Sequence, residues 1–265
     1  MISVILTTYE RRALLARALA SVFAQTLTDR EVIVVDDGST DGTVEFLGTQ
    51  PVTLIRVAHS GNPAVVRNAG LERAHGDLIT FLDSDDVWRP TALDELAAAL
   101  DDHPEAGFAH CDYKPPLLHP PPLPVAGDIF NQLLGLDVLV TSGVLVRRSV
   151  AETVGVFDPR CSPAEDWDYW LRMAARFLAV HVPHQLVVIG APPDSLSRAP
   201  GGVIYRSNIR VTRKALSWCL ANRRASVPLA RRAYRRSLLA SARYRWHSRA
   251  IARTIHNLVA VARGR

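Results

Sequence analysis

The chain has 265 residues, of which 48% are apolar, so it is long enough for one large domain with a sizeable core plus an appendage. It contains no run near the roughly 18 apolar residues of a membrane-spanning helix, and no basic segment or cleavage site follows Met1, so we expect no signal peptide. The scattered Cys111, Cys161 and Cys219 fit neither a disulfide framework nor a CxxC metal site. We therefore expect buried thiols in a reducing cytoplasm.

Charge divides the chain into two parts. The net charge is +5, but residues 201–265 carry 16 Arg or Lys and no acid, whereas residues 1–200 carry 15 basic residues and all 26 acidic ones. Such a split predicts two domains with different partners. Residues 1–200 would hold carboxylates for a purpose such as metal binding, and the basic extension 201–265 would attract anions.

The first hundred residues alternate between strand and helix patterns. Short runs rich in Val, Ile and Leu predict strands at 2–7, 31–35, 52–57 and 77–82. In residues 11–25, and again after Pro90, apolar residues recur with the spacing of one helical face.

The remaining pattern adds a loop, two strands and helices. The proline-rich residues 115–124 predict a surface loop, 141–147 a strand, 163–177 a helix and 186–189 a late strand. From about Gly202 the pattern is helical to the end, with a break at Pro228. The alternation predicts an α/β fold, a mostly parallel sheet flanked by helices, with a basic helical C-terminal extension.

Polar segments follow three of the predicted strands. They are Thr8-Tyr9-Glu10, Asp36-Asp37-Gly38-Ser39 and Asp83-Ser84-Asp85-Asp86. Ligands of open parallel sheets bind beyond the carboxyl ends of the strands, so these segments are candidates for a binding site.

The carboxylates after the second strand have two interpretations. Asp36 and Asp37 can accept hydrogen bonds from a nucleotide base or from ribose hydroxyls. Alternatively, Ser39 or Asp41 caps the next helix and Gly38 makes a tight turn.

The acidic segment at 83–86 predicts a cation site. Three carboxylates within four residues repel one another unless a cation or hydrogen-bond donors intervene. Mg²⁺ and Mn²⁺ prefer oxygen ligands, and Mg²⁺ often binds one or two carboxylates together with substrate phosphates. The alternative is an acidic cap for the helix that begins near Pro90.

A third acidic segment begins the predicted helix at 163–177. Glu165 and Asp168 would share one face, while Asp166 would point elsewhere and could act as a general base at the mouth of a pocket. Favourable interaction of acids with the helix dipole is the other explanation. Trp167 and Trp170 also share a face, either in the core or beside a sugar.

Five segments, in order, resemble those of the family 2 glycosyltransferases, which are inverting enzymes with a GT-A fold. They are VILTTYER, VVDDGSTDGT, GNPAVVRNAGLERAHGDLITFLDSDD, TSGVLVRRSVAETVGVFD and AEDWDYWLRM, and they span roughly residues 2–180. The resemblance implies transfer of a sugar from a UDP- or dTDP-linked donor to an acceptor hydroxyl, with Mg²⁺ or Mn²⁺ as cofactor. Cell-surface polysaccharide or glycoconjugate synthesis is the implied setting, and the acceptor could be a sugar or lipid-linked.

The resemblance also implies roles for individual residues. On the donor side, Thr8, Tyr9 and Glu10 would surround the base and ribose, Asp36 or Asp37 would hydrogen-bond the base, and Arg67 and Asn68 would lie near the phosphates or base. Asp83 would approach the ribose, and Ser84 would also bind the donor. On the acceptor side would lie Thr141, Ser142, Gly143, Glu165 and Trp167. Asp166 would be the catalytic base, and Asp85 would ligate the cation, with Asp83 as a second candidate.

One departure from the family pattern concerns the metal. Family members often carry a His before an S-x-S segment near the end of the catalytic domain, but residues 190–198 contain none. Asp194 is a candidate substitute, because hard cations accept carboxylate ligands.

Other functions fit the sequence less well. A non-catalytic relative that binds nucleotide sugars, or a scaffold, is the main alternative, and the presence of both Asp85 and Asp166 argues against it. No GxGxxG follows the first strand, which disfavours a dehydrogenase. The basic extension lacks a named nucleic-acid motif, so nucleic acid is not the expected partner.

The extension itself has two interpretations. Arginines alternate with apolar residues through 203–263, a pattern of basic amphipathic helices that lie on anionic membrane surfaces. The protein would then be cytoplasmic and peripheral at the inner face of the membrane. Alternatively, the apolar faces pack on the catalytic domain or on a second copy in a homo-oligomer.

Overall fold

The computed structural model describes residues 1–114, 126–135, 139–190, 192 and 201–262, and side chains in the C-terminal helices are described for residues 202–244. The predicted loop at 115–124 and the metal candidate Asp194 lie outside the described residues.

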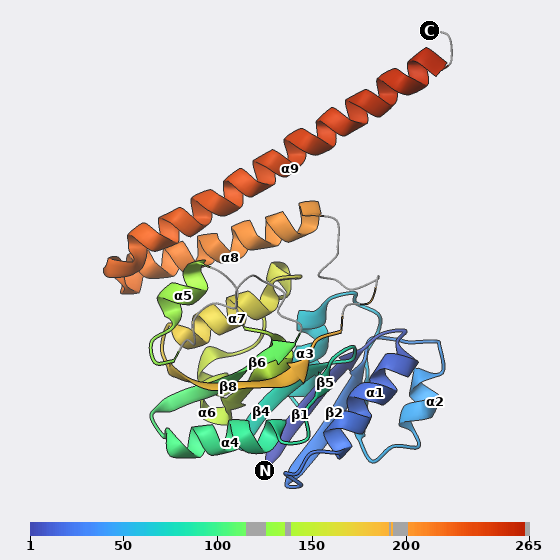
Figure 1. Ribbon diagram of the computed structural model, residues 1–265, viewed down its shortest axis with the longest axis vertical. Helices are drawn as coiled ribbons and strands as arrows, with labels where there is room; N and C mark the ends of the chain where they lie inside the picture. The colour runs from blue at the N-terminus through green and yellow to red at the C-terminus, as the bar shows by residue number, and fades with distance from the viewer. Residues whose placement is uncertain (115–125, 136–138, 191, 193–200, 263–265) are drawn as a thin grey trace.

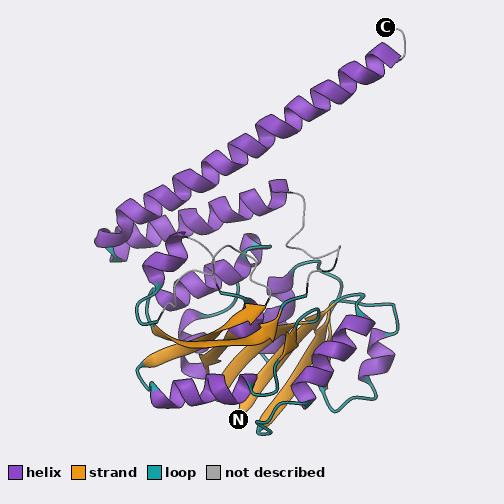
Figure 2. Ribbon diagram, viewed as in Figure 1, coloured by secondary structure: helices purple, strands orange, loops and turns teal. Residues whose placement is uncertain are grey.

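The described residues form one eight-stranded sheet with helices on both faces (Figures 1 and 2). The strand order is β3-β2-β1-β4-β7-β6-β8-β5. The strands are β1 (Ile2–Thr8), β2 (Arg30–Asp36), β3 (Thr53–Arg56), β4 (Leu78–Asp83), β5 (Val87–Trp88), β6 (Ala106–Lys114), β7 (Val144–Arg147) and β8 (Leu178–Val188). The first half of the sheet, β3-β2-β1-β4, is wholly parallel, as predicted.

The second half of the sheet is mixed. The short strand β7 runs antiparallel to both β4 and β6, β6 and β8 are parallel, and β5 runs antiparallel to β8. The α/β class and the flanking helices are confirmed. The predicted strand at 141–147 is shorter than expected, because Thr141–Gly143 form a 3-10 turn before β7.

Helices cover both faces of the sheet because apolar side chains point alternately to one face and to the other along the strands. In β1, Val4 and Leu6 join one buried cluster and Ile5 joins the other. The helices are α1 (Arg12–Phe23), α2 (Thr43–Leu47), α3 (Pro63–Leu71), α4 (Ala92–Asp102), α5 (Phe130–Gly135), α6 (Arg148–Val154), α7 (Glu165–Ala174), α8 (Gly201–Asn222) and α9 (Val227–Ala262). Residues of α1, α2 and α4 belong to the first cluster, and residues of α3, α5, α6, α7 and α8 to the second.

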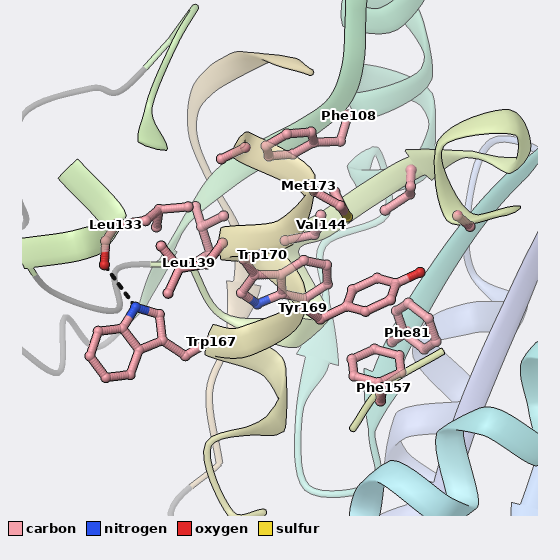
Figure 3. Close-up of a cluster of buried hydrophobic side chains, with 14 of the residues drawn as sticks. Phe81, Phe108, Leu133, Leu139, Val144, Phe157, Trp167, Tyr169, Trp170 and Met173 are labelled. Atoms are coloured by element: carbon pink, nitrogen blue, oxygen red, sulfur yellow. Dashed lines mark hydrogen bonds between the residues drawn. The ribbon is translucent and has the colours of Figure 1, made fainter. Parts of the chain in front are cut away.

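Helix α7 is anchored by aromatic packing (Figure 3). Tyr169 and Trp170 are fully buried, Phe157 stacks on Tyr169 with ring centroids 4.1 Å apart, and Phe81 of β4 meets Phe157 edge-on. Aromatic pairs of this kind add stability beyond the area they bury. The first turn of α7, which carries the predicted base, is therefore held against β4.

The C-terminal helices extend this packing. Val211, Ala215 and Cys219 of α8 belong to the same buried cluster as α7, and α9 runs back along the outer side of α8 (Figure 1). The predicted break lies at Arg223–Ser226, and Pro228 falls in the first turn of α9, where its missing N–H costs nothing. None of the helices in the described part of the chain is both long and apolar enough to cross a membrane.

Candidate active site

The three polar segments meet at one edge of the sheet. Thr8 at the end of β1 is in register with Asp36 at the end of β2, and Thr7 is in register with Asp83 at the end of β4. Because β2, β1 and β4 are adjacent and parallel, their carboxyl ends point the same way. This edge is the candidate site.

Asp36 and Asp37 hold the loops of this edge. Asp36 is buried and accepts a hydrogen bond from Ser39 N at 3.0 Å. Asp37 accepts from Ser60 N at 2.8 Å and from Gly61 N at 2.9 Å. The predicted cap is wrong, because the N-cap of α2 is Gly42 and not Ser39 or Asp41. The contact of Asp36 and Asp37 with a nucleotide stays a prediction.

Gly38 allows the two loops to come together. Its φ is +84°, and a Cβ there would lie 3.1 Å from His59 N. A larger residue would strain the backbone and push the His59 loop away from Asp37.

Tyr9 and Glu10 form the outer rim of the edge. The Tyr9 ring is 41% exposed and stacks on His59 with centroids 4.0 Å apart. Glu10 Oε1 accepts a hydrogen bond from Thr40 N at 2.7 Å, which ties the β1 loop to the β2 loop. Beneath them, Thr8 Oγ1 is buried without a hydrogen-bond partner among the described residues.

In the acidic segment after β4, hydrogen-bond donors of the protein engage the carboxylate of Asp86. Asp86 is buried and accepts hydrogen bonds from Ser142 Oγ at 2.5 Å and from Gly190 N at 2.8 Å. Burial raises the pKa of Asp86 to about 8, with a further contribution from the charge of Asp83, against the effect of these two hydrogen bonds. Ser84 is buried beside it. The contacts of Asp86 therefore hold the loop together, and Asp86 is not a candidate for ligand binding.

Asp85 and Asp83 are the carboxylates placed to ligate a cation. Arg11 Nη1 lies 3.6 Å from Asp85 Oδ2, and Asp83 gives Oδ1 to Arg67 Nη2 at 2.7 Å, which leaves its second oxygen. Two carboxylates at a solvent-accessible edge fit a Mg²⁺ or Mn²⁺ ion that takes its other ligands from water and a diphosphate. The residues present therefore fit the implied metal.

A different set of side chains lies closer together but is already bridged. Among the described residues, Asp158, Cys161 and Asp168 are the one group of three whose ligand atoms all lie within 4.8 Å of one another. Lys214 Nζ of α8 lies 2.8 Å from Asp158 Oδ2 and 2.7 Å from Asp168 Oδ1. An ammonium group thus occupies the position that a cation would take.

Arg67 connects the acidic segment to α7. It is 5% exposed, and its Nη1 donates to Glu165 Oε1 at 2.6 Å while Nη2 donates to Asp83. Burial alone lowers the pKa of Arg67, but the charges of Asp83 and Glu165 outweigh burial and raise it. The guanidinium is therefore a fixed positive charge at the site.

Asn68 has a structural partner. Its Nδ2 donates to Phe157 O at 3.0 Å and its Oδ1 accepts from Phe157 N at 2.9 Å. Both ends of the amide are thus engaged with the backbone of Phe157. Its predicted donor contact is untested, and any such contact would have to be made in addition to this clamp.

Asp166 lies at the start of α7 beside Arg67 and Glu165. It is half-buried, Thr141 Oγ1 donates to its Oδ2 at 3.2 Å, and Trp167 N donates to its Oδ1 at 2.8 Å. Burial, together with the charge of Glu165, raises the pKa of Asp166 to about 6 against the opposing charge of Arg67. A carboxylate with this pKa can accept a proton near neutral pH.

The remaining acceptor-side candidates are mostly buried. Trp167 is 8% exposed and its indole donates to Leu133 O at 2.8 Å (Figure 3), while Trp170 lies in the core. Ser142 and Gly143 are buried behind Asp86, and Glu165 is 3% exposed. Of the five, Thr141 is the residue whose side chain contacts Asp166 by a hydrogen bond. Glu165 and Asp168, predicted to share a face, are both buried but pair with different arginines, Glu165 with Arg67 and Asp168 with Arg172.

Four residues of this edge were not predicted as site residues: Arg11, His59, Asp86 and Gly190. The acidic segment itself pointed to Asp86, and position after a strand could have suggested His59. Gly190 carries no such signal, yet a Cβ there would lie 2.1 Å from Asp85 O. A glycine is needed where the β8 end passes against the acidic segment.

A family model for glycosyl transferase family 2 matches residues 3–155, more than half of the chain and the whole of the edge formed by β1, β2 and β4. The chain belongs to glycosyl transferase family 2. This glycosyltransferase is 29% identical over 198 residues to the uncharacterized glycosyltransferase YwdF of Bacillus subtilis (strain 168), covering 71% of this chain and 73% of YwdF. It is 42% identical over 101 residues to the succinoglycan biosynthesis protein ExoW of Rhizobium meliloti (strain 1021), covering 35% of this chain and 31% of ExoW.

Solved structures share the fold of the glycosyltransferase. The mannosyltransferase PcManGT from Pyrobaculum calidifontis superposes with a TM-score of 0.69 at 21% identity, over 98% of this chain and 80% of that one. Residues 1–349 of TarS from Staphylococcus aureus give a TM-score of 0.68 at 20% identity, over 81% of this chain and 66% of that one. The predicted GT-A-type fold is confirmed by these similarities.

Proposed function

We propose that this glycosyltransferase moves a sugar from a UDP- or dTDP-linked donor to an acceptor hydroxyl with inversion, in the synthesis of a cell-surface polysaccharide or glycoconjugate. The observation that carries the proposal is Asp166, a half-buried carboxylate with a pKa raised to about 6, held beside the strand edge with the acidic segment. ExoW is named for succinoglycan biosynthesis, and TarS as a poly(ribitol-phosphate) beta-N-acetylglucosaminyltransferase. TarS was solved with UDP-GlcNAc, and PcManGT with GDP-Man and Mn²⁺.

In the proposed reaction Asp166 acts as the general base. One of its oxygens takes the proton of the acceptor hydroxyl, and the acceptor oxygen attacks the anomeric carbon opposite the diphosphate. The bond from that carbon to the diphosphate oxygen breaks, and the nucleoside diphosphate leaves with the bonding electrons. Attack from the opposite face inverts the configuration. Thr141, which donates to Asp166, orients the carboxylate for this step.

The donor lies along the strand edge. Tyr9 presents an exposed ring on which a base could stack, and Asp36 and Asp37 border the same loop. Asp85, with the second oxygen of Asp83, would hold Mg²⁺ or Mn²⁺, which when bound compensates charge on the departing diphosphate. Arg67 and Arg11 add fixed positive charge on either side of the acidic segment.

The experiment is a panel of UDP-, dTDP- and GDP-sugars incubated with the enzyme, with release of the nucleoside diphosphate as the readout. Asp166→Asn should lower turnover on the active donor by about 10²–10⁴, the usual contribution of a positioned base, while nucleotide binding persists. Asp94→Asn, an exposed acid on α4, is the matched control. A non-catalytic relative would bind a nucleotide sugar but release no nucleotide with either acceptor or water, and that outcome would favour the alternative.

We also propose that the chain divides at residue 200 into a catalytic domain and a basic helical extension, that it works in the cytoplasm, and that it can form a homo-oligomer. The sharing of one buried cluster by α7 and α8 means that the extension would be fixed to the catalytic domain and not tethered loosely.

A further inference from the structure

The C-terminal hairpin of α8 and α9 carries charge that the active site does not use. Residues 201–265 contain 16 Arg or Lys and no acid. In the view of Figure 1, α8 lies between the α/β body and α9, so one side of α9 faces α8 and the other faces away from the protein.

The inner side of the hairpin is fully occupied. On α9, the small residues Ala230, Ala233, Ser237 and Ser241 are buried, with the 3-4-4 spacing of one helical face. A few cations of the hairpin are engaged with the catalytic domain: Lys214 pairs with Asp158 and Asp168, and Arg223 with Asp128. These contacts fix α8 on the body, and Arg236 of α9 donates to Gly135 O at 2.8 Å, which fixes α9 as well.

The outer side of α9 repeats the same spacing with different residues. Arg232, Arg235, Leu239 and Arg243 also follow a 3-4-4 spacing, offset to the opposite face, and all four are exposed. Leu239 is 57% exposed and the neighbouring Leu238 is 40% exposed. We call Arg232, Arg235, Arg243, Leu238 and Leu239 the outer stripe.

This combination favours a lipid surface over other polyanions. Arginine side chains attract phosphate groups of any anionic partner, but nucleic acid backbones offer nothing to exposed leucines. At a bilayer interface, leucine enters the acyl boundary while arginine reaches the headgroups, which is the pattern of interfacial helices. We propose that the outer stripe of α9 docks the glycosyltransferase on an anionic phospholipid membrane.

The proposal explains why the extension is rigidly packed. Because α8 shares the core of α7, a membrane bound to α9 would fix the orientation of the strand edge and of Asp166 relative to the bilayer. Vesicle binding needs neither donor nor acceptor, so the proposal stands or fails independently of the proposed reaction.

The test is flotation of the full-length protein with vesicles of phosphatidylcholine alone and of phosphatidylcholine with phosphatidylglycerol, at low and high salt. Capture is expected with the anionic vesicles alone and should weaken as salt rises. Each arginine near an anionic surface adds about fivefold, so R232Q/R235Q/R243Q should weaken binding on the order of 100-fold. The control R17Q/R73Q/R89Q removes the same charge from exposed positions of the catalytic domain and should have little effect.

Three results would overturn the proposal. The first is absence of capture by anionic vesicles at low salt. The second is an equal loss of capture in both triple variants, which would mean a general charge effect. The third concerns L238S/L239S, which should lose vesicle binding while its binding to duplex DNA, measured in parallel, is unchanged from wild type. If this variant floats as well as the wild type, the leucines do not enter a bilayer and the stripe is only a polyanion site. Circular dichroism melts of each variant confirm that it is folded.

Discussion

Arg67 and Glu165 form a buried ion pair in which Nη1 and Oε1 are 2.6 Å apart, joining α3 to the first residue of α7. The two residues are 98 positions apart in the chain, and their side chains are 6% and 3% exposed. Through its other nitrogen the same guanidinium reaches Asp83 at the end of β4. One side chain thus links the proposed donor side to the residue that precedes the proposed base.

We predict that Arg67→Met destabilises the protein by about 3–5 kcal/mol. Removing one partner of a buried pair leaves the other charge without compensation. The free energy of unfolding in urea measures the effect, and Arg73→Met, at an exposed position just after α3, should change it little. In Arg67→Met/Glu165→Gln the unpaired charge is gone, so part of the loss should return. If Arg67→Met lowers the free energy of unfolding by less than about 1 kcal/mol, the pair behaves as a surface ion pair, which would contradict its buried position.

The pH dependence of kcat/KM should report Asp166. The pKa of this carboxyl is raised to about 6, and the base must be ionised, so activity should fall as the pH drops through about 6. The charge of Glu165 contributes to the increase, so Glu165→Gln should shift this acid limb to lower pH. Initial rates across pH for both proteins measure the shift. If the midpoint of the acid limb is unchanged in Glu165→Gln, the limb does not report the ionisation of Asp166.

Loss of Asp85 should affect nucleotide binding only when metal is present. We expect Asp85→Ala to weaken UDP binding in Mn²⁺ or Mg²⁺ by at least the roughly 10–100-fold that loss of an outer-shell partner costs in metal sites. In EDTA the variant and the wild type should bind UDP alike. Calorimetry in the two buffers measures this, with Asp101→Ala on the exposed side of α4 as control. Equal affinities of the variant and the wild type in metal would remove Asp85 from the cation site.

Lys214 should be the cation that fastens α8 to α7 and to the loop before it. Its Nζ contacts Asp158 and Asp168. Hydrogen bonds to charged groups contribute about 1.5–3 kcal/mol, so we expect Lys214→Met to lower the free energy of unfolding by about that amount. Lys214→Arg should retain most of it. Thermal unfolding followed by circular dichroism provides the measurement, and Arg213→Met, exposed next to it, is the control. Equal melting temperatures for Lys214→Met and Arg213→Met would contradict this role.

The sequence by itself determined the parallel half of the fold and the edge that carries the site. Strands β1, β2 and β4 were predicted within a residue or two, because buried parallel strands are short apolar runs that end in polar turns. The polar segments after them had to meet once these strands were neighbours. The break near Pro228 was predicted for an equally local reason, since proline is tolerated only in the first turn of a helix.

Only the tertiary structure decided which partners the buried polar residues have. The antiparallel insertion of β7, the strand β6 and the full length of β8 depend on pairing between distant segments, which local pattern does not encode. Arg67 with Glu165, Ser142 with Asp86, and Lys214 with Asp158 are likewise contacts across 98, 56 and 56 positions. A buried charge must find a partner wherever the packed core brings one close, so its identity follows from the three-dimensional arrangement. For the same reason the pKa of Asp166 could not be read from its neighbours in sequence, because burial and the positions of Glu165 and Arg67 set it.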